Sequence, residues 1–276
     1  PATVSPGILE KMHMTGGLLA TINEIPVAGN SMTFNTVAET SRADGSRQGG
    51  LRGYWLEEGG AKTASAPKWS QISLKLHKVA ALCYATDELL EDVGALAAWI
   101  GKAVPEELKF MVEDAIFEGD GVGKPLGLRS SPAMISVLRR TLLTIDAIDL
   151  AAMWARRYAG ANDYVWLVSP SVYPAFLNMS VGNIPVWIPG TGITGANTFS
   201  GAIFGRPVIE TEYSETLGTV GDIVLFSPSQ YAAIGKASGI QAASSIHVNF
   251  LYDESVFRFV YRVDGCPLWQ SAITGY

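Results

Sequence analysis

The sequence predicts an α+β fold, in which helices and strands are mixed without the regular strand–helix–strand repetition of a doubly wound sheet. Two patterns support this prediction. After Gly94, apolar residues recur every three or four positions over about six helical turns. Near the end of the chain, residues 255–263 alternate between two sets of side chains, which is the period of a strand. The chain has 276 residues, enough to enclose a substantial hydrophobic core.

The first 80 residues show little sign of a compact core. Residues 1–40 are rich in Gly, Pro, Thr and Asn, which predicts an extended N-terminal arm that needs a partner surface. The next 40 residues predict a long β-hairpin. Its first strand is a short aromatic one at 53–56, a flexible turn follows, and its second strand alternates Ile72, Leu74 and Leu76 with polar residues. A hairpin of this length is marginal in water, so we expect it to lie on another surface.

The helical repeat predicts a long helix over residues 86–118, with one apolar and one acidic face. Thr86 is the expected N-cap, because its hydroxyl and the carboxylates after it satisfy free N–H groups. Pro105 is expected to kink the helix. The apolar face consists of Leu96, Ile100, Val104, Leu108, Met111 and Ala115. A structural turn with positive φ angles is expected to follow, formed by Gly119, Asp120, Gly121, Gly123, Pro125 and Gly127.

The second half of the chain predicts short elements in close succession. Helices are expected over 146–159 and from Pro170 onward, and a second structural turn at Gly205 and Pro207. Strands are expected at 164–169, 207–211, 222–226, 231–235 and 255–263. The segment from 164 to 205 contains no Asp, Glu, Lys or Arg, but its prolines and glycines interrupt every apolar window long enough to span a bilayer. We therefore expect folded backbone covered by its own core or by another subunit.

Composition excludes several classes of protein. Charged residues make up 17% of the chain, against about 25% in an average soluble domain, so ordinary solvated surface is scarce. The net charge of −6 argues against a protein that binds nucleic acid through a basic face. Cys83 and Cys266 are expected to be free thiols in a reducing compartment, with one long-range disulfide as the alternative. The start at Pro1 predicts a trimmed or processed N-terminus without a targeting segment.

No catalytic or cofactor motif is found. In the glycine-rich turn, the sixth position counted from Gly121 is Leu126, which breaks the dinucleotide fingerprint. A phosphate-binding loop needs Ser or Thr after its lysine, and here Pro125 follows Lys124. The three histidines have no zinc-ligand spacing, and no GxSxG elbow occurs. We expect no enzyme, no cofactor and no metal, with a small-molecule hydrolase using Ser, Asp and one His as the remote alternative.

Charge is distributed unevenly along the chain. Residues 41–80 carry a net charge of +4, and residues 81–120 carry −8. A basic hairpin lying across the acidic helix region of an adjacent copy would be electrostatically complementary. Head-to-tail contacts of this kind close into rings or shells. The interface residues that we expect are Arg47, Arg52, Lys62, Lys68, Trp69, Glu106 and Glu113.

Four segments together carry a family resemblance. They are the end of the acidic helix with its glycine-rich turn at 118–128, the strand-to-helix step at 168–170, the turn at 205–208, and the close of the last long strand at 262–265. These segments and the order of the elements resemble the major capsid proteins of tailed bacteriophages with the Hong Kong 97 fold. The resemblance covers nearly the whole chain.

That resemblance implies an order of domains. Residues 1–45 would form an N-terminal arm, 46–80 an extended loop that reaches over a neighbour, and 81–139 a peripheral domain built on a spine helix. Residues 140–245 would form an axial domain, and 246–276 would return to the peripheral domain. The implied function is that of a major capsid protein whose pentamers and hexamers build an icosahedral shell around double-stranded DNA.

The same resemblance implies the partners and the location. Besides further copies of the chain, the partners are a portal, a maturation protease and a decoration protein. Packaged DNA is contacted non-specifically, and no membrane is involved. The protein would reside in the virion after assembly in the bacterial cytoplasm of the host. The alternatives are a gene-transfer particle or an encapsulin-like nanocompartment with the same fold.

Some members of the resembled family join their subunits by an isopeptide bond between Lys and Asn, promoted by a Glu. By the resemblance, Lys62 stands at the position of the loop lysine and Asp253 at that of the acceptor. The position of the promoting acid falls near Val260, and no acid occurs between residues 255 and 263. An ammonium is not a nucleophile until a base takes its proton. We therefore expect that Lys62 and Asp253 form no cross-link.

Overall fold

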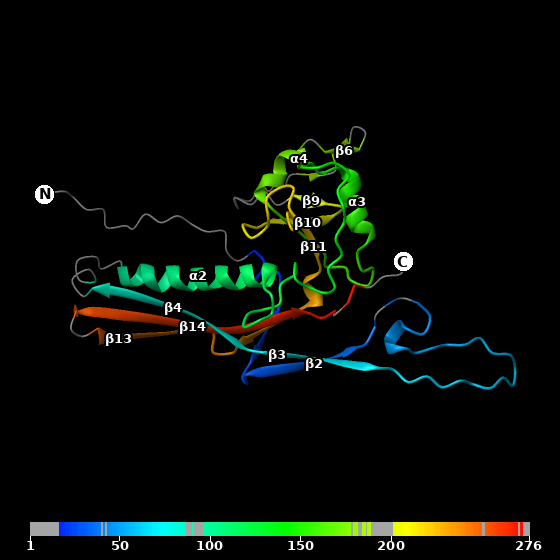
Figure 1. Ribbon diagram of the computed structural model, residues 1–276, viewed down its shortest axis with the longest axis horizontal. Helices are drawn as coiled ribbons and strands as arrows, with labels where there is room; N and C mark the ends of the chain where they lie inside the picture. Colours follow the sequence, from blue (N-terminus) through cyan, green and yellow to red (C-terminus); the bar gives the residue numbers. More distant parts are fainter. Residues whose placement is uncertain are drawn as a thin grey trace.

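The structure is a computed structural model that describes residues 17–39, 41, 43–86, 90, 96–177, 179–181, 184–185, 187–188, 201–249, 252–269 and 271–272. Its shape is elongated (Figure 1). A long sheet with one helix lying along it forms the lower body, and a smaller sheet with short helices lies above one end. A two-stranded ribbon leads from the long sheet into a loop that projects from the molecule.

The long sheet is organised around the last strand of the chain, β14 (Glu254–Pro267). On one side β14 pairs with β4 (His77–Thr86) over ten residues. On the other side it pairs first with β13 (Gln241–Asn249) and then with β12 (Tyr231–Lys236). β1 (Glu24–Val27) joins the outer edge of β12 in parallel orientation. The strand expected at 255–263 is therefore confirmed, and it is the centre of the sheet.

The predicted long helix is confirmed as α2 (Leu96–Glu118), the spine helix, which lies along one face of the long sheet (Figure 1). Ile100 and Leu108 pack onto Ala85 and Phe259 of the sheet. The opposite face of the sheet has no helix over it among the described residues. Pro105 lies within the helix, which continues on both sides of it.

One detail of the helix prediction is wrong. Met111, assigned to the apolar face, is 48% exposed, because the helix turns its Val112 and Ile116 toward the core in the last turns. Thr86, the expected N-cap, is the last residue of β4 and pairs with Glu254, and the residues that it would cap lie outside the described part of the chain. Between Thr86 and Leu96 only residue 90 belongs to the described residues.

The smaller sheet has the strand order β11 (Ile223–Phe226), β5 (Val165–Val168), β10 (Arg206–Glu210), β9 (Ala202–Ile203) and β8 (Trp187–Ile188). It confirms the strands expected at 164–169, 207–211 and 222–226. The helices that accompany it are α3 (Ala147–Ala155) and α4 (Tyr173–Leu177), and a short ribbon is formed by β6 (Ser180–Val181) and β7 (Ile184–Pro185). Single 3-10 turns occur at Arg47–Gly49, Pro170–Val172 and Pro228–Gln230.

Trp166 of β5 is the centre of the core of the smaller sheet. Its side chain is fully buried, and its indole N–H donates to the carbonyl oxygen of Ile203 at 3.2 Å. Leu150 of α3 and Phe176 of α4 pack around it. The uncharged stretch of the sequence is thus covered in part by its own core, as expected, although residues 189–200 lie outside the described part of the chain.

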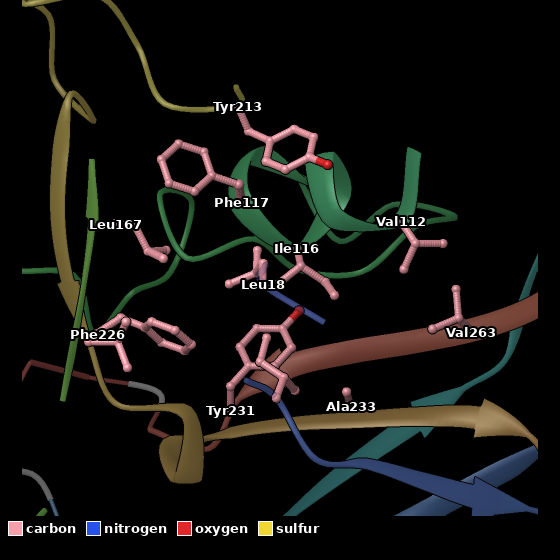
Figure 2. Packing of buried hydrophobic residues seen from close by; sticks show 12 residues of the cluster. Leu18, Val112, Ile116, Phe117, Leu167, Tyr213, Phe226, Tyr231, Ala233 and Val263 are labelled. Carbon is pink, nitrogen blue, oxygen red and sulfur yellow. The ribbon is translucent and has the colours of Figure 1, made fainter. Parts of the chain in front are cut away.

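A second core joins the two sheets to the spine helix. Figure 2 shows Ile116 and Phe117 of α2 facing Leu167 and Phe226 of the smaller sheet on one side and Tyr231 of the long sheet on the other. The fully buried Leu18 sits among them (Figure 2). Burial of this kind stabilises a fold by about 25 cal/mol per Å² of apolar area, so these contacts hold the two sheets in one orientation.

The first strand of the predicted hairpin is wrong. Residues 51–57 form no strand, and β3 (Trp69–Lys75) pairs instead with β2 (Ser31–Val37), from Ser31 opposite Lys75 to Val37 opposite Trp69. β2 lies in the segment expected to be an arm. Its alternation of Met32 and Phe34 with polar residues was the signal that sequence reasoning missed. The inward side chains pack with Ile72 and Leu74.

The described part of the expected arm is built into the fold. Leu18 and Ile22 are buried, and β1 and β2 belong to sheets, so an arm with little core of its own is wrong for residues 17–37. The axial boundary expected at 245 is also wrong, because β12 and β13 pair with β14 in the long sheet. The change between the two sheets occurs after β11, at residue 226.

Candidate assembly surfaces

The extended loop comprises residues 43–68, which connect the β2–β3 ribbon at its outer end and project from the molecule (Figure 1). Two backbone hydrogen bonds close its base. The N–H of Lys68 donates to the carbonyl of Gly49 at 2.9 Å, and the N–H of Ala38 donates to the carbonyl of Lys68 at 3.1 Å. Beyond this base no strand pairing occurs within residues 50–67, so the fold fixes where the loop starts and leaves its surface open.

Large apolar side chains are exposed on this loop. Trp55 is 104% exposed, and Leu51, Tyr54 and Leu56 are each about half exposed. At the end of the ribbon Trp69 is also exposed. Large apolar side chains exposed in one segment are typical of an interaction site, and Trp and Tyr are among the residues that dominate binding energy at protein interfaces. The extended loop therefore carries a surface suited to burial against another molecule.

The predicted basic residues of the loop differ in their surroundings. Arg47 forms an ion pair with Asp44 at 3.1 Å, which neutralises it locally. The backbone N–H of Arg52 donates to the Ser65 hydroxyl at 3.1 Å, and its guanidinium lies against Gly45. Lys62 and Lys68 are exposed. Lys68 thus closes the loop through its backbone while its side chain stays accessible.

The two predicted acids of the spine helix do not lie together on the surface. Glu106 is half-buried. Glu113 is 1% exposed and lies inside the protein, so its assignment to an exposed interface is wrong. Its carboxylate accepts hydrogen bonds from the Leu19 N–H at 3.0 Å and from the Tyr213 hydroxyl at 2.7 Å. A buried carboxylate must be hydrogen-bonded in this way, because its desolvation is otherwise costly.

The structure also reduces the expected charge contrast between hairpin and helix. Of the acids in residues 81–120, Glu113 is buried, Glu118 pairs with Arg129, and Asp120 pairs with Lys124 at 3.7 Å. On the basic side, Lys78 belongs to β4 and so to the long sheet. Within the described residues, the exposed charges of loop and helix are therefore more evenly mixed than the sequence totals suggested.

The glycine-rich turn closes the end of the spine helix. The chain folds back after Gly119, and the N–H groups of Leu128 and Arg129 donate to the carbonyls of Ile116 and Phe117 at 2.9 and 3.0 Å. These are carbonyls that a helix leaves without partners at its C-terminus. A hydrogen bond from Gly127 N–H to the Gly119 carbonyl holds the turn together.

The geometry of the turn explains why glycines and an aspartate occur at these positions. Gly121 and Gly123 have φ angles of +78° and +71°, which favour glycine. A Cβ at Gly119 would lie 2.1 Å from the Pro125 carbonyl oxygen, and one at Gly127 would lie 2.5 Å from the Gly119 nitrogen. Asp120 accepts a hydrogen bond from the Val122 N–H, which lowers the pKa of its carboxyl. The positive φ angles expected in this turn occur at Gly121 and Gly123.

The predicted turn at 205–207 joins β9 to β10. Phe204 and Gly205 both have positive φ angles, 50° and 72°, as in the hairpin turns whose twist matches that of the strands. Arg206 pairs with Ile203, and Pro207 with Ala202. Proline fits there because β9 and β10 make only a short ladder.

A second exposed apolar surface was not predicted from the sequence. It lies on the connection between the glycine-rich turn and α3, where Leu138 is 92% exposed and the neighbouring apolar side chains are also exposed. Those side chains are Met134, Ile135, Leu142 and Leu143. They border a cavity of about 610 Å³ beside α3 and β11. The ion pair of Arg139 with the buried Asp222 lies in its wall.

The two residues considered for a cross-link lie far apart within one chain. Lys62 belongs to the extended loop, and Asp253 belongs to the turn between β13 and β14, at the opposite end of the long sheet (Figure 1). A bond between them could form only between two copies. Val260 is half-buried on β14, opposite Ala80 and Gln241.

No metal or membrane site emerges from the described part of the chain. Among those residues no three His, Cys, Asp or Glu side chains lie close enough to bind an ion. None of the described helices is both long and apolar enough to cross a bilayer. Both cysteines are free thiols, as expected, Cys266 buried and Cys83 half-buried.

The chain is similar in sequence to a curated capsid protein. This relative is the capsid polyprotein of Pseudomonas phage PAJU2, which is 26% identical over 233 residues. That alignment covers 81% of this chain and 34% of the polyprotein, so the chain spans about a third of its relative.

Two solved structures show the fold. The capsid of the native GTA particle matches 97% of this chain and 91% of its own, with a TM-score of 0.74 and 14% identity. Microbacterium phage Oxtober96 matches 99% of this chain and 90% of its own, with a TM-score of 0.66 and 15% identity. Together with the spine helix, the long sheet and the extended loop, these matches establish the α+β fold of the Hong Kong 97 type.

The family assignment rests on the whole sequence. The phage capsid family matches residues 1–276, and the curated relative is itself a capsid polyprotein. The chain thus belongs to the phage capsid family and is a structural protein.

Proposed function

We propose that this chain is the major capsid protein of a tailed phage and that its copies assemble, as pentamers and hexamers, into an icosahedral shell around double-stranded DNA. The projecting loop is the observation that carries the proposal. A loop with Trp55 fully exposed and Tyr54 beside it leaves apolar area in contact with water in a monomer. Burial of this area against a neighbouring copy is favourable, and in a closed ring the loop of every subunit can be covered in this way.

The geometry of the loop favours closed assembly. A contact between the loop of one copy and a different surface of the next is heterologous, and repeated rotation closes such contacts into rings. Five- and six-membered rings are the capsomers from which icosahedral shells are built. The exposed apolar connection at residues 134–143 offers a second surface for burial in the same assembly.

The acidic balance of the chain suits a container for DNA. A shell protein must confine nucleic acid without holding it tightly, and binding to phosphates grows with each neutralising cation. At a net charge of −6 each subunit would bind packaged DNA weakly and without sequence preference. The portal, the maturation protease and the decoration protein are proposed as partners on the resemblance to the family alone, as is assembly in the bacterial cytoplasm.

Electron microscopy of the expressed protein tests the proposal. We expect closed shells tens of nanometres across, roughly ten times the size of one domain of this length. The control is the Trp55→Ser/Tyr54→Ser variant, which removes the exposed aromatic rings and leaves the buried cores untouched. It should remain folded but assemble poorly. A wild-type chain that stays monomeric at all concentrations and salt conditions tried would contradict the proposal.

A gene-transfer particle is the second candidate, because the GTA capsid matches the structure with a TM-score of 0.74. The two candidates differ in their contents. Particles purified from the native host would contain copies of one replicating genome in the phage case and random fragments of host DNA in the gene-transfer case. Shells filled with enzyme instead of DNA would indicate a nanocompartment.

A further inference from the structure

The face of the long sheet opposite the spine helix is open and basic. On β4 and β14 the side chains of Ala81, Ala85 and Phe259 point toward α2. Successive residues of a strand point to opposite faces, so the even-numbered residues of these strands point away from the helix. The sheet register places Lys78 directly opposite Arg262. We call this surface, formed by β4, β14 and β13, the open sheet face.

Three cations gather on the open sheet face. Lys78, Arg258 and Arg262 are exposed and border a hollow of about 540 Å³, together with Val260 and residues 241–243. Within residues 78–84, 241–245 and 256–262 the chain has no acid to neutralise them. The guanidinium of Arg262 donates to the Asn30 side chain at 3.1 Å, a neutral partner that orients it without cancelling its charge.

Apolar side chains adjoin the cations on the same face. Leu82 lies opposite Arg258 in the register, and Tyr84 lies two pairs further along β4, opposite Val256. Both are more than half exposed. The open sheet face thus combines positive charge with apolar area, which is the composition of a protein interface.

The tip of the extended loop has the complementary composition. Glu57 and Glu58 stand on a tight turn, in which the Gly60 N–H donates to the Glu57 carbonyl at 3.0 Å and Gly59 has a φ of +84°. Both acids are exposed. The aromatic patch with Trp55 immediately precedes them. Although the hairpin region is basic in total, its outermost turn is therefore acidic.

The tip and the open sheet face cannot meet within one chain. The loop leaves the outer end of the β2–β3 ribbon and projects away from the long sheet (Figure 1). Lys78 and Arg262 lie where β4 begins, at the inner end of that ribbon, and Arg258 lies further along β14. Any contact between the two surfaces must join two copies.

We propose that the loop tip of one copy docks on the open sheet face of the next, with Glu57 and Glu58 paired to Lys78, Arg258 and Arg262 and the aromatic patch laid on Leu82 and Tyr84. This pairing rests on the proposed function and names the two surfaces that would make its contact. It replaces the basic-hairpin-on-acidic-helix contact suggested by the sequence totals.

Charge reversal tests the pairing on the full-length protein. The loop variant is Glu57→Lys/Glu58→Lys, the face variant is Arg258→Glu/Arg262→Glu, and the third protein combines all four changes. We expect each reversed variant to lose at least about tenfold in the fraction of protein found in shells, and the combined variant to recover to within about twofold of wild type. Sedimentation velocity measures the fraction, and circular dichroism checks that each variant is folded.

Matched controls separate this contact from a general charge effect. Glu107→Lys/Asp114→Lys makes the same charge change on the exposed side of α2, and Lys102→Glu/Lys109→Glu on the same helix matches the face variant. Both should assemble as the wild type does. If a reversed variant does not fold, the neutral variants Glu57→Gln/Glu58→Gln and Arg258→Gln/Arg262→Gln replace it. Each neutral variant should abolish most of the salt dependence of assembly, because screening acts on the pairing that they remove.

Several results would overturn the pairing. One is normal assembly of the loop variant or of the face variant. Another is a combined variant as defective as the two reversed variants while all are folded. Normal shells from the face variant that retain less DNA would instead assign the open sheet face to nucleic acid. If the wild type forms shells in each of these cases, the proposed function stands and only the pairing fails.

Discussion

The hydroxyl of Tyr213 donates a hydrogen bond of 2.7 Å to the buried carboxylate of Glu113. Tyr213 follows β10 of the smaller sheet, and Glu113 belongs to the spine helix, so this bond crosses the junction between the two halves of the protein. The same carboxylate accepts the Leu19 N–H from the start of the described chain. Burial and the adjoining carboxylate raise the pKa of the Tyr213 hydroxyl, which therefore keeps the proton that it donates.

Glu113→Ala should be strongly destabilising. It leaves the Tyr213 hydroxyl and the Leu19 N–H without this acceptor in a water-poor site, at a cost of about 3 kcal/mol. Asp114→Ala on the exposed side of the same helix is the matched control and should change the free energy of unfolding by less than about 0.5 kcal/mol. Urea unfolding of both variants measures the difference. Equal stability of the two would show that the Glu113 contacts contribute little.

Gly119→Ala should disrupt the turn that closes the spine helix. The new methyl group would lie 2.1 Å from the Pro125 carbonyl oxygen and 2.3 Å from that of Ala115, both backbone atoms. We expect a loss of about 2–3 kcal/mol. Gly101→Ala is the control, because nothing lies within 4 Å of its new methyl group, and it should stabilise the helix by about 0.5–1 kcal/mol. Thermal unfolding that shifts both proteins the same way would contradict this.

Stability should fall as the pH rises above 9. Burial, with a smaller contribution from Asp264, raises the pKa of the Cys266 thiol from 9.0 to about 11. Between those values the unfolded chain has lost its thiol proton while the folded chain keeps it, so rising pH favours unfolding. The contribution of Cys266 is complete below pH 9.0 and lost by about pH 11. Burial also raises the pKa of Tyr231, which extends the effect upward. The urea concentration at the midpoint of unfolding, measured between pH 9 and pH 11, tests this prediction. The Cys266→Ala variant should show a smaller decrease of that midpoint with pH.

Shells of this protein should contain no covalent oligomers. By the resemblance to the family, Val260 falls where a carboxylate would have to take the proton of Lys62, and Asp253 falls at the acceptor position. Electrophoresis of boiled, reduced particles should show one band near 29.5 kDa. A ladder of covalent multimers that disappears in the Lys62→Arg variant would refute the expectation and identify the lysine.

Deletion of residues 1–16 should block shell formation and leave soluble capsomers or monomers. The cut stops before Leu18, which is fully buried between the two sheets, so the fold itself should survive. Leu18→Ala in the full chain is the comparison. It should lower the free energy of unfolding by about 2–5 kcal/mol and so separate a folding defect from an assembly defect. Normal shells from the shortened chain would count against a role of the arm in assembly.

The sequence allowed the spine helix, its closing turn and the central strand to be predicted, because each carries a strong local signal. The helix has apolar residues at helical spacing, the turn needs glycines at fixed positions, and β14 alternates over residues 255–263. The order of the domains was predicted from the family resemblance. These elements are long or sterically constrained, so neighbouring residues in the sequence determine them.

Pairing and burial could not be predicted in the same way. β3 pairs with a strand that lies beyond the whole extended loop, and nothing in residues 69–75 indicates whether the partner is 53–56 or 31–37. The local sequence does not distinguish Glu113 from the exposed acids of the same helix. Its burial becomes visible only from its contacts with Tyr213 and Leu19, which are distant in the sequence. The open sheet face combines residues from three segments that are distant in the sequence. The net charge of any one stretch of consecutive residues therefore does not reveal that this face is basic.

The central place of β14 has a consequence for the timing of synthesis. Ribosomes make β14 after β4, β12 and β13, yet all three of these strands find a hydrogen-bonding partner in it. Until residues 254–267 emerge, these strands lack their common neighbour, and the spine helix lacks much of the surface that it covers. A chain that stops before β14 would therefore be unable to complete the long sheet.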